Sequence, residues 1–141
     1  MSTTLIPELF RTQMDGLGYE EWDDALNVEN IPSTIIDGAY HVEIPSGEMT
    51  VINQHVLNEA STVNLRVFKK GFANTLTMRD EMLAERQTIL CDILSPAVRL
   101  SSGIKNIVAD SWSITPLSDS NDNSAILEIN FTCITVLQGF N

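Results

Sequence analysis

Residues 125–137 read Ala-Ile-Leu-Glu-Ile-Asn-Phe-Thr-Cys-Ile-Thr-Val-Leu, and apolar side chains alternate with polar ones along most of this stretch. Successive side chains of a β-strand point to opposite faces of its sheet, so the alternation predicts a strand with one buried face. That face would hold Leu127, Ile129, Phe131, Cys133 and Leu137. This is the clearest strand signal in the chain, and the other elements are placed around it.

Two earlier stretches carry a similar signal. Residues 39–44 alternate between polar and apolar side chains, and residues 61–70 do so again. We interpret Pro45-Ser46-Gly47 as a turn between strands, because proline and glycine favour turns. Residues 49–57 would then extend or repeat the first of these strands.

A further strand, over residues 105–115, precedes the last one. Val108, Trp112 and Ile114 alternate along it. Residues 116–124 are rich in Ser, Asp and Asn, which predicts a polar hairpin tip that joins the two strands.

One long amphipathic helix is predicted over about residues 75–94. Thr77 and Asp80 approximate a capping box near its start, and Pro96 stops it. At about 100° per residue, the apolar side chains form one broad stripe that would pack on the sheet. The stripe consists of Met78, Met82, Leu83, Ile89, Leu90, Ile93 and Leu94.

The N-terminal part predicts a short helix over about residues 4–14, which Gly16 and Gly18 end. Residues 19–38 are acidic and are predicted to form a loop, with room for one more helical turn. Together these elements predict an α+β fold. A roughly four-stranded antiparallel or mixed sheet would pack against the one long amphipathic helix, with the short N-terminal helix beside it.

Length and charge narrow the class of protein. A chain of 141 residues, 43% of them hydrophobic, suits a single domain, 1–141. The net charge is −11, and residues 1–60 hold eleven acidic side chains but only one basic side chain, Arg11. Such a surface repels the phosphate backbone, so tight nucleic-acid binding is not expected. No apolar run approaches the roughly 20 residues of a membrane span, and no signal-peptide pattern is present, so we expect assembly in a cytoplasm.

The sequence carries no motif for catalysis or for a cofactor. It has no phosphate-binding glycine loop, no nucleophile elbow and no zinc-protease motif. His41 and His55 could supply a base to Asp110 and Ser113 only if the fold brought these residues together. We interpret both histidines as surface or strand-edge residues, and we predict that the chain is not an enzyme.

Metal binding is not predicted either. Cys91 and Cys133 lie in apolar stretches without a partner at metal-ligand spacing, so we interpret them as buried, reduced thiols, with a disulfide between them as the alternative. Several acidic side chains surround Trp22 and could hold a hard cation, but a solvated acidic face or a docking surface is the preferred interpretation. These side chains are Glu20, Glu21, Asp23 and Asp24.

Two arginines on the long helix suggest an interface between subunits. Arg79 and Arg86 are seven residues apart and are predicted to project from the middle of the apolar stripe. A buried, unpaired guanidinium costs several kcal/mol. Each head group must therefore reach water along its stem or meet a carboxylate, for which a neighbouring subunit is one source. Both interpretations remain open, and the candidate interface comprises Arg66, Arg79, Arg86, Glu20, Glu21, Asp23 and Asp24.

The order of the predicted elements resembles that of the tail-terminator and tail-completion (neck) proteins of long-tailed bacteriophages. The segments that carry the resemblance are 39–44, 63–70, 75–94, 107–114 and 126–137. The resemblance implies a virion structural protein that forms a hexameric ring at the junction of tail tube and neck. Such a ring terminates the tail and joins it to the head connector.

The resemblance also sets expectations for partners and location. They are copies of the chain itself, the tail-tube and head-connector proteins, and DNA that passes through the bore without specific binding. The location would be the tail or neck of the virion, after assembly in the host cytoplasm. Residues 19–38 could be an insertion or an arm that grips a neighbour. A head-to-tail connector or stopper, a tail-tube subunit, and a small non-viral protein-binding adaptor are the alternatives.

Overall fold

The computed structural model describes residues 5–23, 26, 34–98, 103–117 and 123–138. Within the described residues, residues 96–98 are helical, and two helices and five strands have both ends defined. They are α1 (Leu5–Gly16), β1 (Glu20–Glu21), β2 (Ala39–Asn53), β3 (Val56–Phe72), α2 (Thr75–Ile93), β4 (Asn106–Leu117) and β5 (Asn123–Gln138).

All five strands form one sheet in the order β1-β2-β3-β5-β4. β1 runs parallel to β2, and every other neighbouring pair is antiparallel. The predicted α+β fold with a mixed sheet is therefore confirmed. The predicted number of strands was wrong, because Glu20–Glu21, expected within a loop, pairs with the start of β2 and adds a fifth strand.

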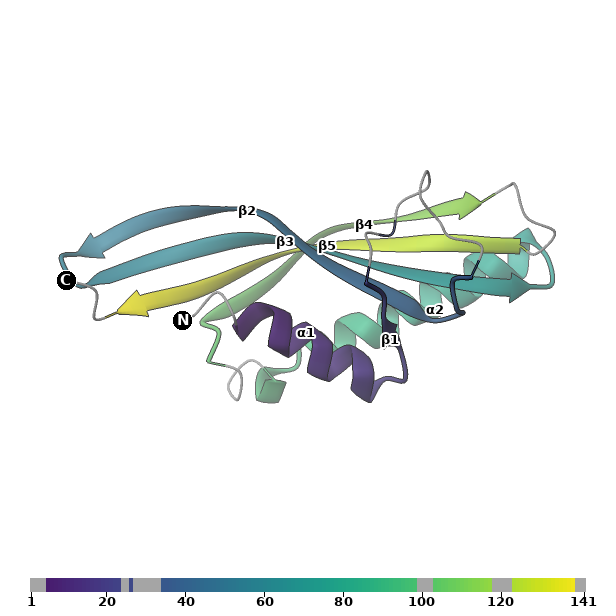
Figure 1. Cartoon of the computed structure of the whole chain (residues 1–141), viewed down its shortest axis with the longest axis horizontal. Coiled ribbons are helices and arrows are strands. Elements are labelled where there is room, and N and C mark those ends of the chain that lie inside the picture. The colour runs from purple at the N-terminus through teal and green to yellow at the C-terminus, as the bar shows by residue number, and fades with distance from the viewer. Residues whose placement is uncertain (1–4, 24–25, 27–33, 99–102, 118–122, 139–141) are drawn as a thin grey trace.

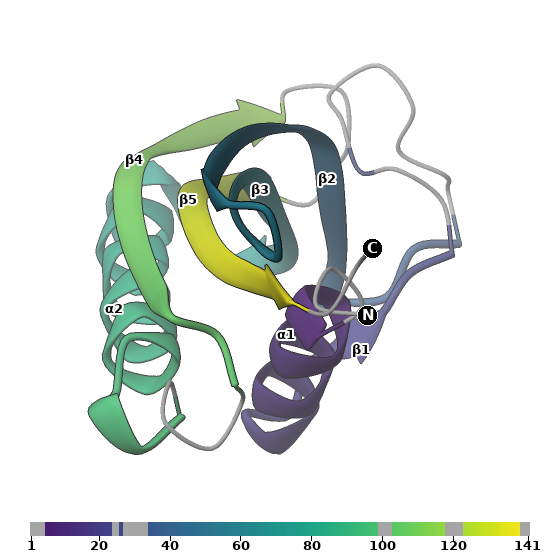
Figure 2. The same ribbon diagram turned by 90° about the vertical axis from the view of Figure 1, so that its left-hand side faces the viewer.

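Both helices lie on the same face of the sheet (Figure 1), α1 near β1 and β2, and α2 near β4 and β5 (Figure 2). The main core fills the space between the helices and this face. At its centre the rings of Phe10 on α1 and Phe131 on β5 meet edge to face, with centroids 5.2 Å apart. The predicted buried face of residues 125–137 is confirmed for Leu127, Ile129, Phe131 and Cys133, whereas Leu137 is only partly buried.

A second, smaller cluster lies on the opposite face of the sheet. Leu26 and Ile35, from the acidic segment 19–38, pack there on Ala39, Phe68 and Ile126. The register places the last three residues side by side on β2, β3 and β5. The described ends of the acidic segment are thus anchored to the sheet by apolar contacts.

The predicted turn at Pro45-Ser46-Gly47 was wrong. The chain continues through these residues as part of β2, with a register shift between Glu43 and Ser46, and it turns only at Gln54 and His55. A bulge accommodates proline at this edge strand, because the irregular backbone there needs no amide donor at that position. The two predicted strand pieces are therefore one strand of 15 residues.

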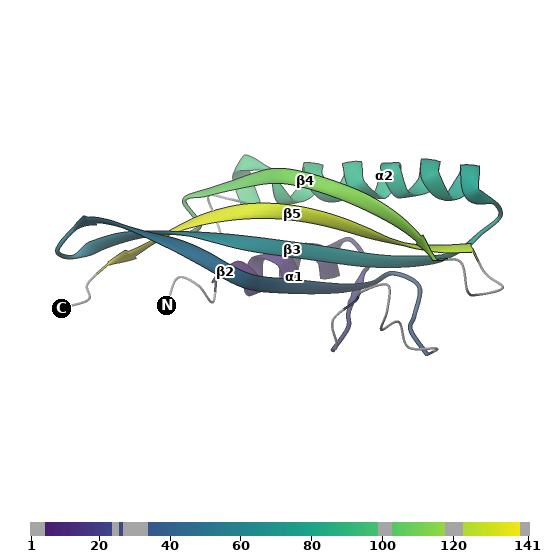
Figure 3. The ribbon, with the colours of Figure 1, turned by 90° about the horizontal axis from the view of Figure 1, so that it is seen from above.

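The resulting β2–β3 hairpin is longer than the helices can cover. Figures 1 and 3 show its outer half projecting beyond both helices together with the end of β5. We call this part, residues 46–60 and 134–138, the extension. Its strands remain paired throughout, with Val51 opposite Leu57 and Leu57 opposite Leu137.

The predicted alternation along residues 105–115 was only partly correct. A bulge at Asp110 shifts the register of β4 against β5 between Ala109 and Ser111. Trp112 then lies opposite the core residue Ile129, whereas Val108 lies opposite Thr132 on the other face. Because a bulge inserts one residue, it reverses which side chains face the helices.

The long helix begins and ends almost as predicted, but its cap and its buried face differ. Asn74 is the N-cap, and its side chain accepts a hydrogen bond from the amide of Thr77, so the capping box at Thr77 was wrong. Met78, Met82, Ile89 and Ile93 are buried, whereas Leu83 and Leu90 are half-buried and Leu94 is exposed. The stripe is thus narrower than predicted and centred near Met82 and Ile89.

The first helix is slightly longer than predicted, and it ends where the glycines indicate. Gly18 takes a φ of +93°, a conformation that glycine adopts without steric cost.

At the other end of the chain, residues 116, 117, 123 and 124 of the predicted hairpin tip belong to β4 and β5. Residues 118–122 of the tip lie outside the described residues.

Candidate functional site

The residues considered for catalysis do not meet. His41 on β2 places its Nδ1 3.1 Å from the carbonyl oxygen of Trp22, and His55 is exposed at the hairpin turn. Asp110 lies on β4, at the other end of the strand order, where its carboxylate accepts a hydrogen bond of 2.6 Å from Thr132. Neither histidine therefore stands beside a nucleophile and a carboxylate.

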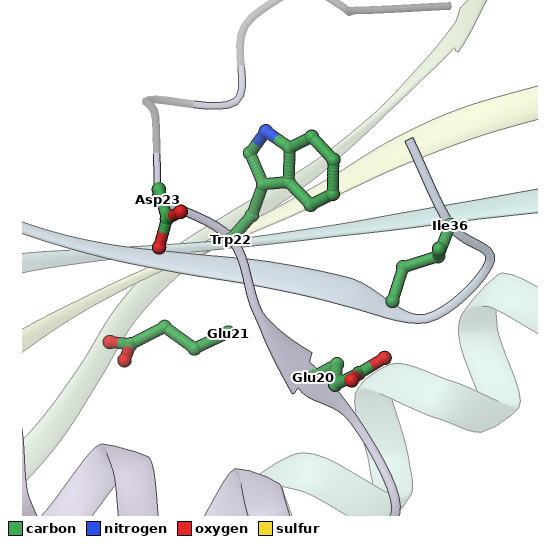
Figure 4. Close-up of a pocket in the computed structure, with 5 residues that line it drawn as sticks. All are labelled: Glu20, Glu21, Trp22, Asp23 and Ile36. Carbon is green, nitrogen blue, oxygen red and sulfur yellow. The ribbon is translucent and has the colours of Figure 1, made fainter. Parts of the chain in front are cut away.

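The acidic side chains around Trp22 line a cavity of about 310 Å³ together with Ile36. Figure 4 shows that Glu20 and Glu21 point in opposite directions from the strand, so their carboxylates do not converge. Glu21 is also engaged by Arg11, whose Nε lies 3.1 Å from its Oε1. Across the described residues, no group of three His, Cys, Asp or Glu side chains is placed to hold a metal ion. Asp24 lies outside the described residues.

Arg66 and Arg79 are engaged within their own chain. Arg66 on β3 bridges the carboxylates of Glu128, at 2.6 Å, and Glu43, at 3.2 Å. Arg79 was predicted in the middle of the apolar stripe, but its side chain is 61% exposed and pairs with the adjacent Asp80. That placement was wrong because the buried face of α2 is narrow, and Arg79 lies beyond its margin.

Arg86 is held differently, at the flank of the stripe. Its guanidinium lies 4.6 Å from the ring centroid of Trp112 on the edge strand β4. Its Nε is buried, and no acceptor among the described residues binds it. Trp112 itself is 45% exposed. Arg86 and Trp112, which we call the edge site, thus present a positioned cation beside an exposed aromatic ring.

Apolar side chains without cover gather on the extension. Met49, Val51 and Ile52 are exposed by 65%, 72% and 53% of their surfaces. Three polar atoms of the extension are buried and have no hydrogen-bond partner among the described residues: Oδ1 of Asn58, Oε1 of Glu59 and Oγ1 of Thr135. Uncovered apolar surface and unsatisfied polar groups are both typical of a surface that another molecule covers.

One side of the extension continues the helix-covered face of the sheet. Side chains that lie opposite one another in the ladder share a face, and on β3 that face runs from Val63 through Ser61 to Glu59 and Leu57. We call the part of it that lies beyond the helices the extension face. It consists of Met49, Val51, Leu57, Glu59, Thr135 and Leu137.

The opposite face of the sheet is polar where the small cluster does not cover it. The Glu43–Arg66–Glu128 bridge crosses three strands there, and the Asp110–Thr132 hydrogen bond lies farther along. Among these residues the three carboxylates outnumber the single guanidinium. These four charged residues give this part of the face a net negative charge.

Several polar groups hold the acidic segment to the body of the domain. The hydroxyl of Tyr19 donates a hydrogen bond to the carboxylate of Glu85 on α2. Lys69 lies 3.5 Å from the same carboxylate and 3.7 Å from that of Asp37. Burial raises the pKa of the Glu85 carboxyl above its ordinary value.

The two thiols differ from one another. Cys133 is buried on β5, where burial chiefly, and then the charge of Asp110, raise its pKa to about 12. Cys91 was predicted to be buried, but it is exposed on α2. The apolar residues around Cys91 in the sequence suggested a wider buried stripe than the helix has. Both cysteines are free thiols.

Sequence reasoning found Arg86 but missed the extension face. The signal available was the run 48–60, where residues 48–51 alternate between polar and apolar side chains before Asn53-Gln54-His55 and the apolar pair Val56-Leu57 follows it. That pattern indicates a hairpin, but it cannot show that the helices end before the hairpin does.

No protein-family model matches the chain, and no curated protein is significantly similar to it in sequence. Among the described residues, no helix combines the length and the apolarity that a membrane crossing would require.

Proposed function

We propose that this chain is a structural subunit that closes with copies of itself into a ring, and that the ring terminates a bacteriophage tail tube at the neck. The observation that carries the proposal is the extension. It displays Met49, Val51 and Ile52 to solvent, well beyond the helices of its own chain. A stable single-domain protein gains nothing from that exposed surface, whereas a subunit that covers it with a neighbour does.

Two unlike surfaces of the domain favour a ring over a two-fold dimer. The extension, formed by β2, β3 and the end of β5, carries Glu48 and Glu59 but no lysine or arginine, whereas the β4 edge carries the edge site with its guanidinium. Unlike surfaces that complement each other form head-to-tail contacts, and such contacts generate rings when the rotation closes.

The polar face of the sheet suits the lining of a bore. The Glu43–Arg66–Glu128 bridge leaves it with an excess of carboxylates. A surface of this sign repels the phosphates of DNA, so that DNA can pass without sticking. The helices would then face outward, toward partner proteins.

Mass measurement and imaging of the purified chain test the proposal. Native mass spectrometry should show one closed oligomer, and negative-stain images should show rings with a central hole. Stacked tubes of indefinite length would favour the tail-tube subunit instead. If the chain remains monomeric both alone and with purified tail tubes, the proposal is wrong.

A further inference from the structure

We infer that Glu59 on the extension of one copy pairs with Arg86 at the edge site of the next copy. The inference rests on the proposed ring and names the contact that closes it. The partner surface is therefore a second copy of this chain, and the recognising chemistry is a hydrogen-bonded ion pair set in apolar surroundings.

The first reason is that each group lacks what the other supplies. Oε1 of Glu59 is a buried acceptor without a donor, and Nε of Arg86 is a buried donor without an acceptor, among the described residues. A guanidinium and a carboxylate form the strongest hydrogen bonds available to side chains. Buried polar atoms in folded proteins are nearly always satisfied. Trp22 Nε1, Asn58 Oδ1 and Thr135 Oγ1 are also without a partner among the described residues, but only Glu59 and Arg86 carry opposite charges, so these two are the ones that point to each other.

The second reason is that one chain cannot make this contact by itself. Trp112, which lies under Arg86, pairs through Ile129 with Leu65 on β3. Glu59 is six residues farther along β3, which at the rise of a strand is about 20 Å. The two unsatisfied groups therefore meet only between copies.

The third reason is that the surroundings fit. Met49, Val51 and Leu57 flank Glu59 on the extension face, and Trp112 offers an exposed apolar ring beside Arg86. Residues 44–61 include Glu48 and Glu59 but no lysine or arginine, so the extension is uniformly acidic. Contact would remove apolar surface from water on both sides while it pairs the charges.

Charge reversal tests the pair. Glu59→Lys and Arg86→Glu should each weaken association about tenfold or more, because each places like charges together at every contact. The chain with both reversals should associate again. So should an equal mixture of the two single variants, because copies of the two variants can alternate around the ring. One contact then joins the two introduced side chains, which are opposite in charge, and the next contact joins the natural glutamate to the natural arginine.

Sedimentation velocity and native mass spectrometry would measure these states, and the mixture should give oligomers with equal numbers of both variants. Arg79→Glu is the matched control, since Arg79 lies two turns earlier on the same helix and is exposed. It should associate as the natural chain does. Circular dichroism verifies that each variant folds.

The neutral variants Glu59→Gln and Arg86→Gln keep the test decisive if a reversal unfolds the chain. Each should weaken association, and the two together should weaken it no further than one alone. If the natural chain forms a ring but the reversals leave association unchanged, or neither the mixture nor the double reversal restores it, the pairing is wrong while the ring stands. If the natural chain never associates, both proposals fail.

Discussion

Val51 and Val63 provide a direct measure of how little the extension contributes to its own fold. Both are valines in the strands of one hairpin, but Val51 is 72% exposed and Val63 is fully buried. Full burial of a valine stabilises a protein by about 1.5–3 kcal/mol. Because only about a quarter of Val51 is covered, Val51→Ser should lower the free energy of unfolding of the monomer by about 0.5 kcal/mol.

Val63→Ser should cost about 3 kcal/mol or more, because it removes a buried side chain and buries a hydroxyl in the main core. The change of residue type is identical at the two sites, so differences in strand propensity largely cancel. Urea unfolding at low protein concentration, followed by circular dichroism, measures both values.

The same variants separate folding from association. At high protein concentration the natural chain should gain stability from self-association, and Val51→Ser should lose that gain. If Val51→Ser destabilises the dilute monomer as much as Val63→Ser does, the extension is covered within its own chain and the reasoning fails.

Three further outcomes follow from single residues. Gly18→Ala should lower the free energy of unfolding by about 1 kcal/mol, because Gly18 has a positive φ. Gly16→Ala should be neutral or stabilising in the same urea assay, because φ is not positive there and a new Cβ meets open space. Equal effects of the two substitutions would contradict the conformational argument. Burial raises the pKa of Glu85 in the folded chain, so the folded state binds that proton more tightly and the free energy of unfolding should fall as pH rises through the folded-state pKa. Glu85→Gln should flatten this fall in urea titrations between about pH 4 and pH 8, and an unchanged slope would assign it to other groups. The native chain should expose one reactive thiol, Cys91, to a thiol reagent, and Cys133 should react only after denaturation; rapid reaction of both would show that β5 opens.

The sequence was informative wherever local period and tertiary burial agree. The hydrophobic periodicity of the strand at 125–137 and of the helix at 75–94 predicts one apolar face for each. The side chains at the centre of both faces are buried. The errors occur where one residue alters the local geometry. Pro45 suggested a turn but lies at a bulge, and Asp110 introduces a bulge that reverses the faces of Val108 and Trp112.

The candidate interface was harder to predict, because it depends on distances between elements. The sequence identified Arg86 as unusual, but the stacking on Trp112 depends on the register between β4 and β5. Glu59 carried no signal, since an acidic residue within a strand is ordinarily solvated. Because the helices end before the hairpin does, Glu59 lies among apolar side chains, and its Oε1 has no hydrogen-bond donor among the described residues.

The bulges at Pro45 and Asp110 have a consequence for how the protein behaves when it is concentrated. Strand-by-strand growth into fibrils requires a straight, unbroken row of amide and carbonyl groups along an open edge. The outer part of β2 is interrupted by a proline, and β4 by an extra residue that carries a charge. Neither edge therefore offers a regular row of backbone groups for another strand to pair with. Copies that meet at these edges bind through their side chains, and open-ended growth by strand pairing is disfavoured.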